Sequence, residues 1–395
     1  MKYCVLIMDG AAGLPLPEHG GKTSLELACT PNLDAMAKQG QVGMVKTVPS
    51  NLEPDSAVAC MSLFGYDPEK YYRGRAPIEA MSLGIPFSPG EVLFRCNLVT
   101  IEDNIMVSHS AGSITTGEAH QLVEALNRAL GNDNIKIFPG TGYRSILKMK
   151  NARGTARAVC TPPHDIPGKP VLDYLPRGEG SELLLDLMTR SQAVLKDHPV
   201  NQTRAARGDL PATSIWLFWG SGHTPHTPSF RDTYKLRAAV TSGVNLLNGL
   251  GKMTGMDLLE TPGVTDGLDN DYDAQAKAAL DALKNYDIVI VHIETPDEAG
   301  HIGSVKEKVE AIEKIDAAVV GRLLKWGDEA LRVLVSPDHP TPIPLRTHTS
   351  DPVPFLLWGK GIKPNGAQRL TESEAKKTLV LINPGYRIMR RLIGE

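Results

Sequence analysis

The chain has 395 residues, of which 42% are hydrophobic and 22% are charged, and its formal net charge is −3. This length allows one large α/β domain with an insertion, or two domains. The small net charge gives no reason to expect a nucleic acid or an acidic membrane surface as partner.

The chain opens with a short apolar run that ends at Asp9, and this run predicts a buried β-strand. The run is too short for a secretory signal, and no window of the sequence approaches a transmembrane span. The five cysteines are scattered and include no CxxC pair, which is typical of reduced thiols. We therefore expect a cytoplasmic protein.

A helical pattern covers residues 24–39, with Pro31 near a helix start and Gly40 just past an end. Ser56 then follows Asp55 and precedes a run of small apolar residues. A serine that opens a helix holds its hydroxyl beside unpaired backbone N–H groups, where a phosphoryl anion is stabilised. Taken alone, Ser56 is more simply interpreted as an ordinary helix cap.

The middle of the chain has a different pattern. Between residues 91 and 151 two strand-like runs precede a helix near 117–130, and two more strand-like runs follow it. This ββαββ order is typical of a small α+β domain. A second helix is expected at about 179–196, and the apolar run 213–222 is predicted to return as a strand to the main sheet. The predicted domains are a discontinuous core, residues 1–88 and 210–395, and an inserted cap, residues 89–209.

The C-terminal half supplies two more apolar, β-branched runs, with amphipathic helical patterns at 273–284 and 305–325. Each run ends in a loop that carries aspartate and histidine residues. Near-continuous apolar runs are typical of strands buried on both faces of a parallel sheet. The alternation of strands and helices predicts an α/β fold with a doubly wound core sheet.

Carboxylates and imidazoles gather at one edge of this predicted sheet, because the loops after three of its strands carry them. This mixture of oxygen and nitrogen ligands suits Zn²⁺ or Mn²⁺ better than Ca²⁺. There are too many ligands for one tetrahedral ion, so we expect two metal ions, which together activate an oxygen nucleophile and clamp a phosphoryl group. The predicted ligands are Asp9, Asp297, His301, Asp338, His339 and His348.

These features together resemble the alkaline phosphatase superfamily and, within it, the archaeal-type cofactor-independent phosphoglycerate mutases with their bacterial relatives, some of them named homoserine kinases. The resemblance covers nearly the whole chain and includes FRCNLVT at 94–100, PDEAGH at 296–301 and SPDHPTPIPLRTHTSDPVPF at 336–355. It implies an alkaline phosphatase-like core with two divalent ions, manganese or zinc, with magnesium or cobalt as further options. It also implies that Ser56 is the phosphorylated nucleophile. The implied ligand sets are Asp297, His301 and His348 for one ion, and Asp9, Ser56, Asp338 and His339 for the other.

The chain departs from this family at two places. Family members commonly have Gly-Ser-Asp around the nucleophile, whereas here Asp55 precedes it and Ala57 follows. The mutases usually carry Asp-Arg-Arg-Ala-Gly-Arg in the inserted domain, whereas residues 108–113 here read Ser-His-Ser-Ala-Gly-Ser. The lost arginines would bind a carboxylate or phosphate bidentately. This second departure favours the branch named homoserine kinase. Candidate substrate anchors are Arg75, Arg204 and Arg207.

The expected function is phosphoryl transfer through phospho-Ser56, as a phosphoglycerate mutase-like isomerase that converts 2-phosphoglycerate to 3-phosphoglycerate in glycolysis. One alternative is a phosphotransferase or phosphohydrolase that acts on another small phosphorylated metabolite. A homoserine kinase is another, although the chain has no P-loop or glycine-rich kinase signature. A non-catalytic binding protein is the third. The expected partner is a small phosphorylated metabolite, with no nucleic acid and no membrane, and a homo-oligomer is left open.

Overall fold

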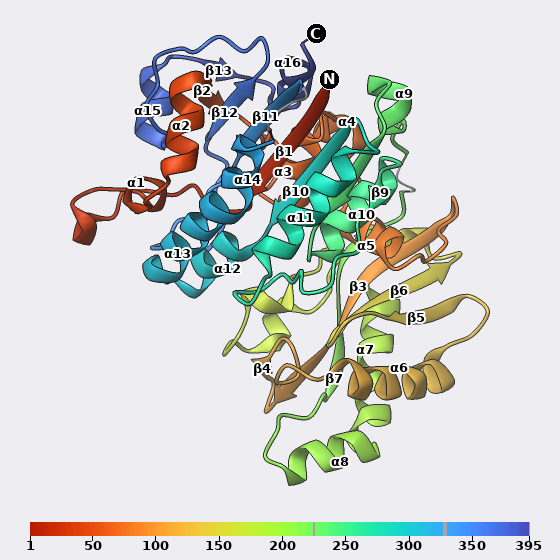
Figure 1. Ribbon diagram of the computed structural model, residues 1–395. Helices are drawn as coiled ribbons and strands as arrows, with labels where there is room; N and C mark the ends of the chain where they lie inside the picture. Colours follow the sequence, from red (N-terminus) through yellow and green to blue (C-terminus); the bar gives the residue numbers. More distant parts are fainter. Residues whose placement is uncertain (224–225, 327–329, 395) are drawn as a thin grey trace. The chain divides into compact units, whose positions relative to one another are not determined.

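The computed structural model describes residues 1–223, 226–326 and 330–394 (Figure 1). The chain divides into two compact units. The core unit comprises residues 1–72 and 226–395, and the inserted unit comprises residues 73–225. No helix among the described residues is long and apolar enough to cross a membrane.

The core unit is built on an eight-stranded sheet with the strand order β13-β2-β12-β11-β1-β10-β8-β9. Its strands are β1 (Lys2–Met8), β2 (Gln41–Val45), β8 (Ala238–Thr241), β9 (Asp257–Leu258), β10 (Ile288–Ile293), β11 (Leu331–Ser336), β12 (Val353–Gly359) and β13 (Leu381–Ile382). The predicted α/β class is confirmed. The sheet is mixed rather than purely parallel, because β12 runs antiparallel to both of its neighbours, β11 and β2.

The three central strands fix where the polar loops emerge. Figure 1 shows β1 between β10 and β11, and the pairing is parallel on both sides. Met8 lies opposite Ile293, and Ile7 lies opposite Ser336, so the three strands end at nearly the same level. Nearly every residue of these strands is buried, which is the reason for their continuous apolar sequence.

The helices of the core unit follow the predicted pattern with two differences. The helical pattern at 24–39 is broken before Pro31, because a proline at the first position of a helix has no N–H and cannot continue the preceding one. The pattern at 305–325 runs through a π-helical turn at Asp316–Val320. The core helices are α1 (Ser24–Leu27), α2 (Pro31–Gln39), α3 (Ser56–Leu63), α4 (Pro68–Tyr71), α9 (Phe230–Tyr234), α10 (Asn245–Met253), α11 (Tyr272–Leu283), α12 (Thr295–Ile302), α13 (Val305–Ile315), α14 (Gly321–Leu324), α15 (Glu372–Lys377) and α16 (Ile388–Ile393).

The inserted unit has its own antiparallel sheet, in which the long strand β3 pairs with β4, β6 and β7, and β6 pairs with β5. Its strands are β3 (Glu91–Glu102), β4 (Ile105–Ser108), β5 (Ile135–Pro139), β6 (Arg144–Lys150) and β7 (Ser214–Ser221). Its helices are α5 (Arg75–Ser82), α6 (Thr116–Leu130), α7 (Ser181–Lys196) and α8 (Pro199–Ala206).

The prediction that the run at 213–222 returns to the main sheet is wrong. This run forms β7, which pairs with β3, and its Trp216 and Phe218 are buried in the hydrophobic core of the inserted unit. Helix α5 also belongs to the inserted unit, because its Ala76 and Ala80 pack with Leu93 of β3. The unit boundaries therefore fall at 72/73 and 225/226 rather than at the predicted 88/89 and 209/210.

Candidate active site

The loops after the three central strands bring the predicted ligands of the core unit together. Asp9 directly follows β1, Asp297 lies in the first turn of α12 after β10, and Asp338 lies two residues after β11. All three side chains are almost completely buried. Gly10, which follows Asp9, has a φ of +59°, and a Cβ atom there would lie 2.4 Å from Oδ1 of Asp297. The close approach of the two ligand loops therefore requires a glycine at this position.

Asp297, His301 and His348 form the first cluster. His301 lies one helical turn after Asp297, and its Nε2 is 3.0 Å from Oδ2 of that aspartate. Nε2 of His348 is 3.5 Å from Oδ1 of Asp297 and 2.9 Å from Nε2 of His301. The three side chains thus direct their potential ligand atoms at one another.

Ser56, Asp9, Asp338 and His339 form the second cluster, which is centred on Nε2 of His339. This atom is 3.1 Å from the hydroxyl of Ser56, 3.2 Å from Oδ2 of Asp338 and 3.7 Å from Oδ1 of Asp9. Ser56 is the first residue of α3, and the side chain of Asp55 caps this helix by accepting the N–H of Ala57 at 2.7 Å. The imidazole of His339 stacks on that of His348 with a centroid distance of 3.9 Å, so the two clusters touch.

Two residues in this site do not follow from the sequence patterns. His292 lies inside β10, and its Nε2 is 2.6 Å from Oδ2 of Asp9, while its Nδ1 bonds to the hydroxyl of Ser242 at 2.9 Å. Lys308 of α13 is completely buried and donates to the carbonyls of Ala12, at 3.1 Å, and Thr341, at 2.7 Å. Lys308 therefore links the loop after Asp9 to the loop after His339 by hydrogen bonds.

The electrostatics of the site fit divalent cations. Burial raises the pKa of Asp9 well above its usual value, and the charges of Asp338, Glu294 and Asp297 raise it further. Oδ1 of Asp9 and Oε2 of Glu294 are buried without a hydrogen-bond partner. Buried carboxylates that crowd together in this way need positive charge close by. The donor set of carboxylate oxygens, imidazole nitrogens and one hydroxyl is suited to Mn²⁺ or Zn²⁺.

The pKa values of Asp297 and His339 are both lowered, but for different physical reasons. Burial would raise the pKa of Asp297, but hydrogen bonds from His301 and His348 outweigh burial and hold that pKa well below its usual value. The pKa of His339 is lowered to about 3, first by burial and then by the charge of His348. His339 is therefore neutral at physiological pH, which is the state that a metal ligand requires.

Comparison with known proteins identifies the family. Residues 37–201 match a protein family that is described as "2,3-bisphosphoglycerate-independent phosphoglycerate mutase". A protein of that name from Methanothrix thermoacetophila is 45% identical over 397 residues, which cover 100% of both chains. The chain belongs to the 2,3-bisphosphoglycerate-independent phosphoglycerate mutase family. Another protein of that name, from Methanosarcina barkeri, is 46% identical over 95% of each chain.

Solved structures agree with this assignment. A protein from Pyrococcus horikoshii superposes with a TM-score of 0.84 at 28% identity, over 100% of this chain and 96% of that chain. The cofactor-independent phosphoglycerate mutase of Thermoplasma acidophilum gives a TM-score of 0.66 at 26% identity, over 100% and 99% of the two chains. The predicted family is confirmed, and with it the class of phosphoglycerate mutase-like isomerases.

The three arginines predicted as substrate anchors lie in the inserted unit of this mutase-family chain, and two of them share a structural role. Arg204 is 3% exposed and donates to Glu118 and to the carbonyl of Ala111. Arg207 donates to Glu118 as well, at 2.7 Å. The structure therefore brings Arg204 and Arg207 together on Glu118, whereas it places Arg75 on a different carboxylate, Glu79, at 2.9 Å.

The bonds to Glu118 predict a loss of stability in the variant Glu118→Gln. Partial burial disfavours its charge, but bonds from Arg207 and Thr115 and the charge of Arg204 lower the pKa of Glu118 to about 2. The pKa of this carboxyl is lower in the folded protein than in the unfolded chain, where it is about 4.3. Its ionised form therefore stabilises the fold at pH values above 4.3, and this stabilisation is lost as the pH falls towards 2. We expect the variant to lose about 1–2 kcal/mol of unfolding free energy at pH 7, after allowing for solvent screening.

Urea unfolding of wild type and variant at pH 7 and at pH 3.5 measures this effect, and the difference between the two proteins should shrink at the lower pH. Glu124→Gln is the matched control, because Glu124 lies on the same helix in an exposed ion pair with Arg128. We expect that control to change stability by less than about 0.5 kcal/mol. Equal stabilities of wild type and Glu118→Gln at both pH values would contradict the prediction.

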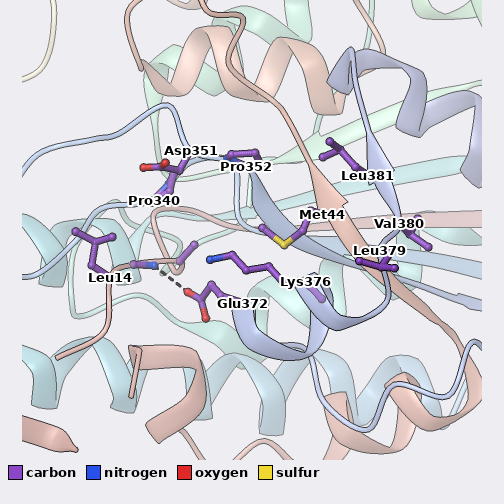
Figure 2. Close-up of a pocket in the computed structure, with 13 residues that line it drawn as sticks. Leu14, Met44, Pro340, Asp351, Pro352, Glu372, Lys376, Leu379, Val380 and Leu381 are labelled. Atoms are coloured by element: carbon purple, nitrogen blue, oxygen red, sulfur yellow. Dashed lines mark hydrogen bonds between the residues drawn. The ribbon is translucent and has the colours of Figure 1, made fainter. Parts of the chain in front are cut away.

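A separate cavity of about 430 Å³ lies in the core unit (Figure 2). Its walls include Leu14, Met44 and Leu379, and Glu372 in its wall accepts the N–H of Gly13 at 3.0 Å. None of the seven predicted metal ligands lines it. The cavity is therefore distinct from the metal-ligand clusters.

Proposed function

We propose that the protein is a metal-dependent phosphoglycerate mutase that transfers the phosphoryl group through Ser56. One observation carries this proposal: the hydroxyl of Ser56 lies 3.1 Å from Nε2 of His339, inside a buried cluster of carboxylates and imidazoles. The family membership supports the reaction, which interconverts 2-phosphoglycerate and 3-phosphoglycerate, a step of glycolysis. We place the protein in the cytoplasm, with a small phosphorylated metabolite as its partner and no nucleic acid or membrane.

The proposal includes two divalent ions, manganese or zinc, with magnesium or cobalt as further candidates. When bound, such ions lower the pKa of a coordinated hydroxyl and neutralise the charge of the transferring phosphoryl group. We assign the side chains that would hold them to the two clusters described above. Asp297, His301 and His348 would hold one ion, and Asp9, Ser56, Asp338 and His339 the other.

The protein's own groups prepare Ser56 for this role. The start of α3 carries a partial positive charge, which favours a phosphoryl anion on the first residue of the helix. Asp55 accepts the N–H of Ala57 and so fixes the direction in which the helix begins. His292 bonds to Asp9 at 2.6 Å and holds that carboxylate in place, as outer hydrogen bonds orient the ligands of metal sites.

A second candidate is a related phosphotransferase or phosphohydrolase that acts on another small phosphorylated metabolite, as in the branch named homoserine kinase. It is favoured by residues 108–113, where the chain has no arginine. The core clusters serve either reaction equally well. In both candidates we retain Arg75, Arg204 and Arg207 as proposed substrate contacts, and a homo-oligomer is compatible with both.

Turnover of the metal-loaded protein distinguishes the two candidates. We expect the protein, reconstituted with Mn²⁺ or Zn²⁺, to convert 3-phosphoglycerate to 2-phosphoglycerate until the two reach equilibrium. ³¹P NMR follows both isomers and inorganic phosphate in one sample. A mutase releases almost no inorganic phosphate, because the phosphoryl group returns to the same molecule. Release of phosphate without the second isomer indicates a hydrolase. Reaction with another phosphorylated metabolite alone indicates the second candidate.

A further inference from the structure

The cavity in the core unit is enclosed by segments that lie far apart in the sequence (Figure 2). They are the loop after β1, strand β2, the loop after β11 and the stretch from α15 to β13. The volume of the cavity is about 430 Å³, and most of its lining residues are apolar, among them Leu14, Met44 and Leu381. A concave apolar site of this size suits a small molecule, because burial of the ligand's apolar surface supplies most of the affinity.

One buried carboxylate interrupts this apolar wall. Glu372, the first residue of α15, is 7% exposed, and it accepts the N–H of Gly13 at 3.0 Å and the hydroxyl of Thr23 at 2.6 Å. Burial raises the pKa of Glu372, and these two hydrogen bonds oppose that effect. Among the described residues, no lysine, arginine or histidine forms an ion pair with it. A buried carboxylate without a counter-ion is stabilised by a cation that enters the cavity.

The other two charged residues of the wall are Asp351 and Lys376. Two carboxylates and one ammonium group give the wall a net negative formal charge. Lys376 lies one helical turn after Glu372 on α15, is exposed, and forms no ion pair within the part of the chain that the structure describes. Figure 2 shows its side chain extending into the cavity, with the nitrogen on the side of Glu372. Lys376 thus places an alkylammonium group where an organic cation would bind, and this long side chain can turn out into solvent.

The cavity borders two loops that carry proposed metal ligands. Gly13 of its wall lies four residues after Asp9, and Pro340 directly follows His339. Lys308 joins these two loops by hydrogen bonds. A ligand that contacts the wall therefore acts on the segments that position Asp9 and His339.

The charge of Glu372 also reaches the metal-ligand clusters. Burial lowers the pKa of Lys308 to about 8, and the charges of Asp297, Glu372 and Asp9 oppose this effect. One ammonium group therefore lies within electrostatic reach of the cavity carboxylate and of two proposed metal ligands. A further cation beside Glu372 would repel a divalent ion in those clusters, because charges in a buried region are poorly screened.

We propose that this cavity is a binding site for a small organic amine with an apolar body. The ammonium group of the ligand lies beside Glu372 and takes the place of the Lys376 ammonium, while the apolar body contacts Leu14, Met44 and Leu381. A hydrogen bond from an ammonium group to a buried carboxylate is stronger than one between neutral groups. Occupation of the site weakens the binding of a divalent ion in the neighbouring clusters, and this second part rests on the proposed function.

Titrations of the full-length, Mn²⁺-loaded protein at pH 7, followed by the NMR signals of the probe, test the site. The probes are phenethylamine, 2-phenylethanol and 3-phenylpropanoate, which share an apolar body and differ in the charge of the end group. The amine should bind about tenfold or more tightly than the alcohol or the acid. Glu372→Gln should weaken the binding of the amine by about 10- to 100-fold and leave that of the alcohol within about twofold. Lys376→Gln should strengthen the binding of the amine by about twofold or more, because it removes a competing ammonium group.

The matched control is Lys377→Gln, because Lys377 is the next residue on α15, pairs with Glu374 at 2.8 Å and does not line the cavity. This variant should bind all three probes as the wild type does. Equal affinities for the amine and the alcohol overturn the site, and so does an unchanged affinity for the amine in Glu372→Gln. Tighter binding of the acid that is lost in Lys376→Gln also overturns it, because the ligand would then be an anion. Lys376→Gln changes an exposed side chain and decides the question even if Glu372→Gln does not fold.

A second copy of the chain is the competing occupant, because Leu379 in the cavity wall is 91% exposed. Sedimentation of the wild type and of Leu379→Ser distinguishes the two. The same sedimentation coefficient for both proteins sustains the site for a small molecule. A wild-type dimer that Leu379→Ser dissociates, together with binding of the amine in that variant alone, overturns it.

The effect on the metal-ligand clusters is measured without turnover. Saturating phenethylamine should weaken the binding of Mn²⁺ by about fivefold or more, and Mn²⁺ should weaken the binding of the amine by the same factor. The alcohol should leave the affinity for Mn²⁺ unchanged, and Glu372→Gln should abolish the effect of the amine. Equal affinities for Mn²⁺ with and without the amine overturn the second part of the proposal. If the proposed function fails and the protein binds no Mn²⁺, the same probes and variants decide the amine site in the metal-free protein.

Discussion

Ser56→Ala is expected to lower kcat for phosphoryl transfer by about 10⁴-fold or more, since removal of a covalent nucleophile has effects of this size. The fold should survive, because Ser56 is a small residue at the start of α3 and alanine is well tolerated in a helix. Most metal affinity should survive as well, because Asp9, Asp338 and His339 remain in the second cluster. Turnover of 3-phosphoglycerate, elemental analysis and thermal unfolding measure the three quantities.

Ser62→Ala is the control for this experiment. Ser62 lies on the same helix and is also buried, but its hydroxyl donates to the backbone carbonyl of Thr47 rather than facing the ligand cluster. Its removal should cost about 1 kcal/mol of stability and leave kcat near the wild-type value. Acid trapping with labelled substrate should place phosphate on the peptide that contains Ser56, and only in proteins that retain this serine.

Near-wild-type turnover by Ser56→Ala would show that the phosphoserine mechanism is wrong. Direct attack by water on the substrate would then be the better explanation, and release of inorganic phosphate would accompany it. Attack by water is a real alternative because Ala57 follows the nucleophile in this chain, whereas members of the family commonly have an acidic residue there. In this chain the N–H of Ala57 bonds instead to the acidic residue before the nucleophile, Asp55.

The sequence predicted those parts of the site that depend on strand ends. A continuous apolar run reveals a buried strand, and the polar residue just after it emerges at the sheet edge whatever the strand order is. Asp9 and Asp338 could therefore be placed together before any pairing was known. Asp297 and His301 could also be placed together from the sequence, because their spacing of four residues puts them on one face of α12.

His292 could not be recognised in the same way. It lies within the apolar strand β10, where a single histidine is compatible with an ordinary core position. Its role depends on register: His292 pairs with Ile7, two residues before Asp9, so the imidazole reaches the carboxylate that follows β1. Register is a property of two strands, and a pattern in one strand does not contain it.

The membership of β7 was mispredicted for a related reason. Its apolar sequence is compatible with either sheet, and only the strand with which it pairs determines which sheet it joins. Val99 lies opposite Ser214 and Leu93 opposite Ser221, so β7 pairs with β3 from end to end, with one register shift between Leu93 and Arg95. Local hydrophobicity reveals that a strand exists, whereas long-range pairing determines which sheet it joins.

Metal content is expected to be two divalent ions per chain after reconstitution, and the two clusters should lose them separately. Asp338→Asn removes a carboxylate from the cluster around Ser56, and His348→Ala removes an imidazole from the cluster around Asp297. Each variant should retain close to one ion per chain by elemental analysis, and each should lose at least about 10²-fold in kcat. His19→Ala is the control, because His19 is exposed and lies outside both clusters.

The affinity for these ions should rise with pH. Burial disfavours the charged form of His301, but its hydrogen bond to Asp297 raises the pKa of His301 to about 9, so the metal-free protein holds a proton there at pH 7. A metal ion can bind Nε2 only after this proton leaves, and the pKa of His348 is raised in the same direction. Each drop of one pH unit below 9 should therefore weaken binding in the cluster of Asp297 by about tenfold or more.

Calorimetry at pH 7 in buffers of different ionisation enthalpy should detect at least one proton released per ion. If no proton is released and affinity is constant between pH 6 and pH 9, His301 is not a metal ligand. Two ions per chain would then have to be held by the remaining six ligands, Asp9, Ser56, Asp297, Asp338, His339 and His348.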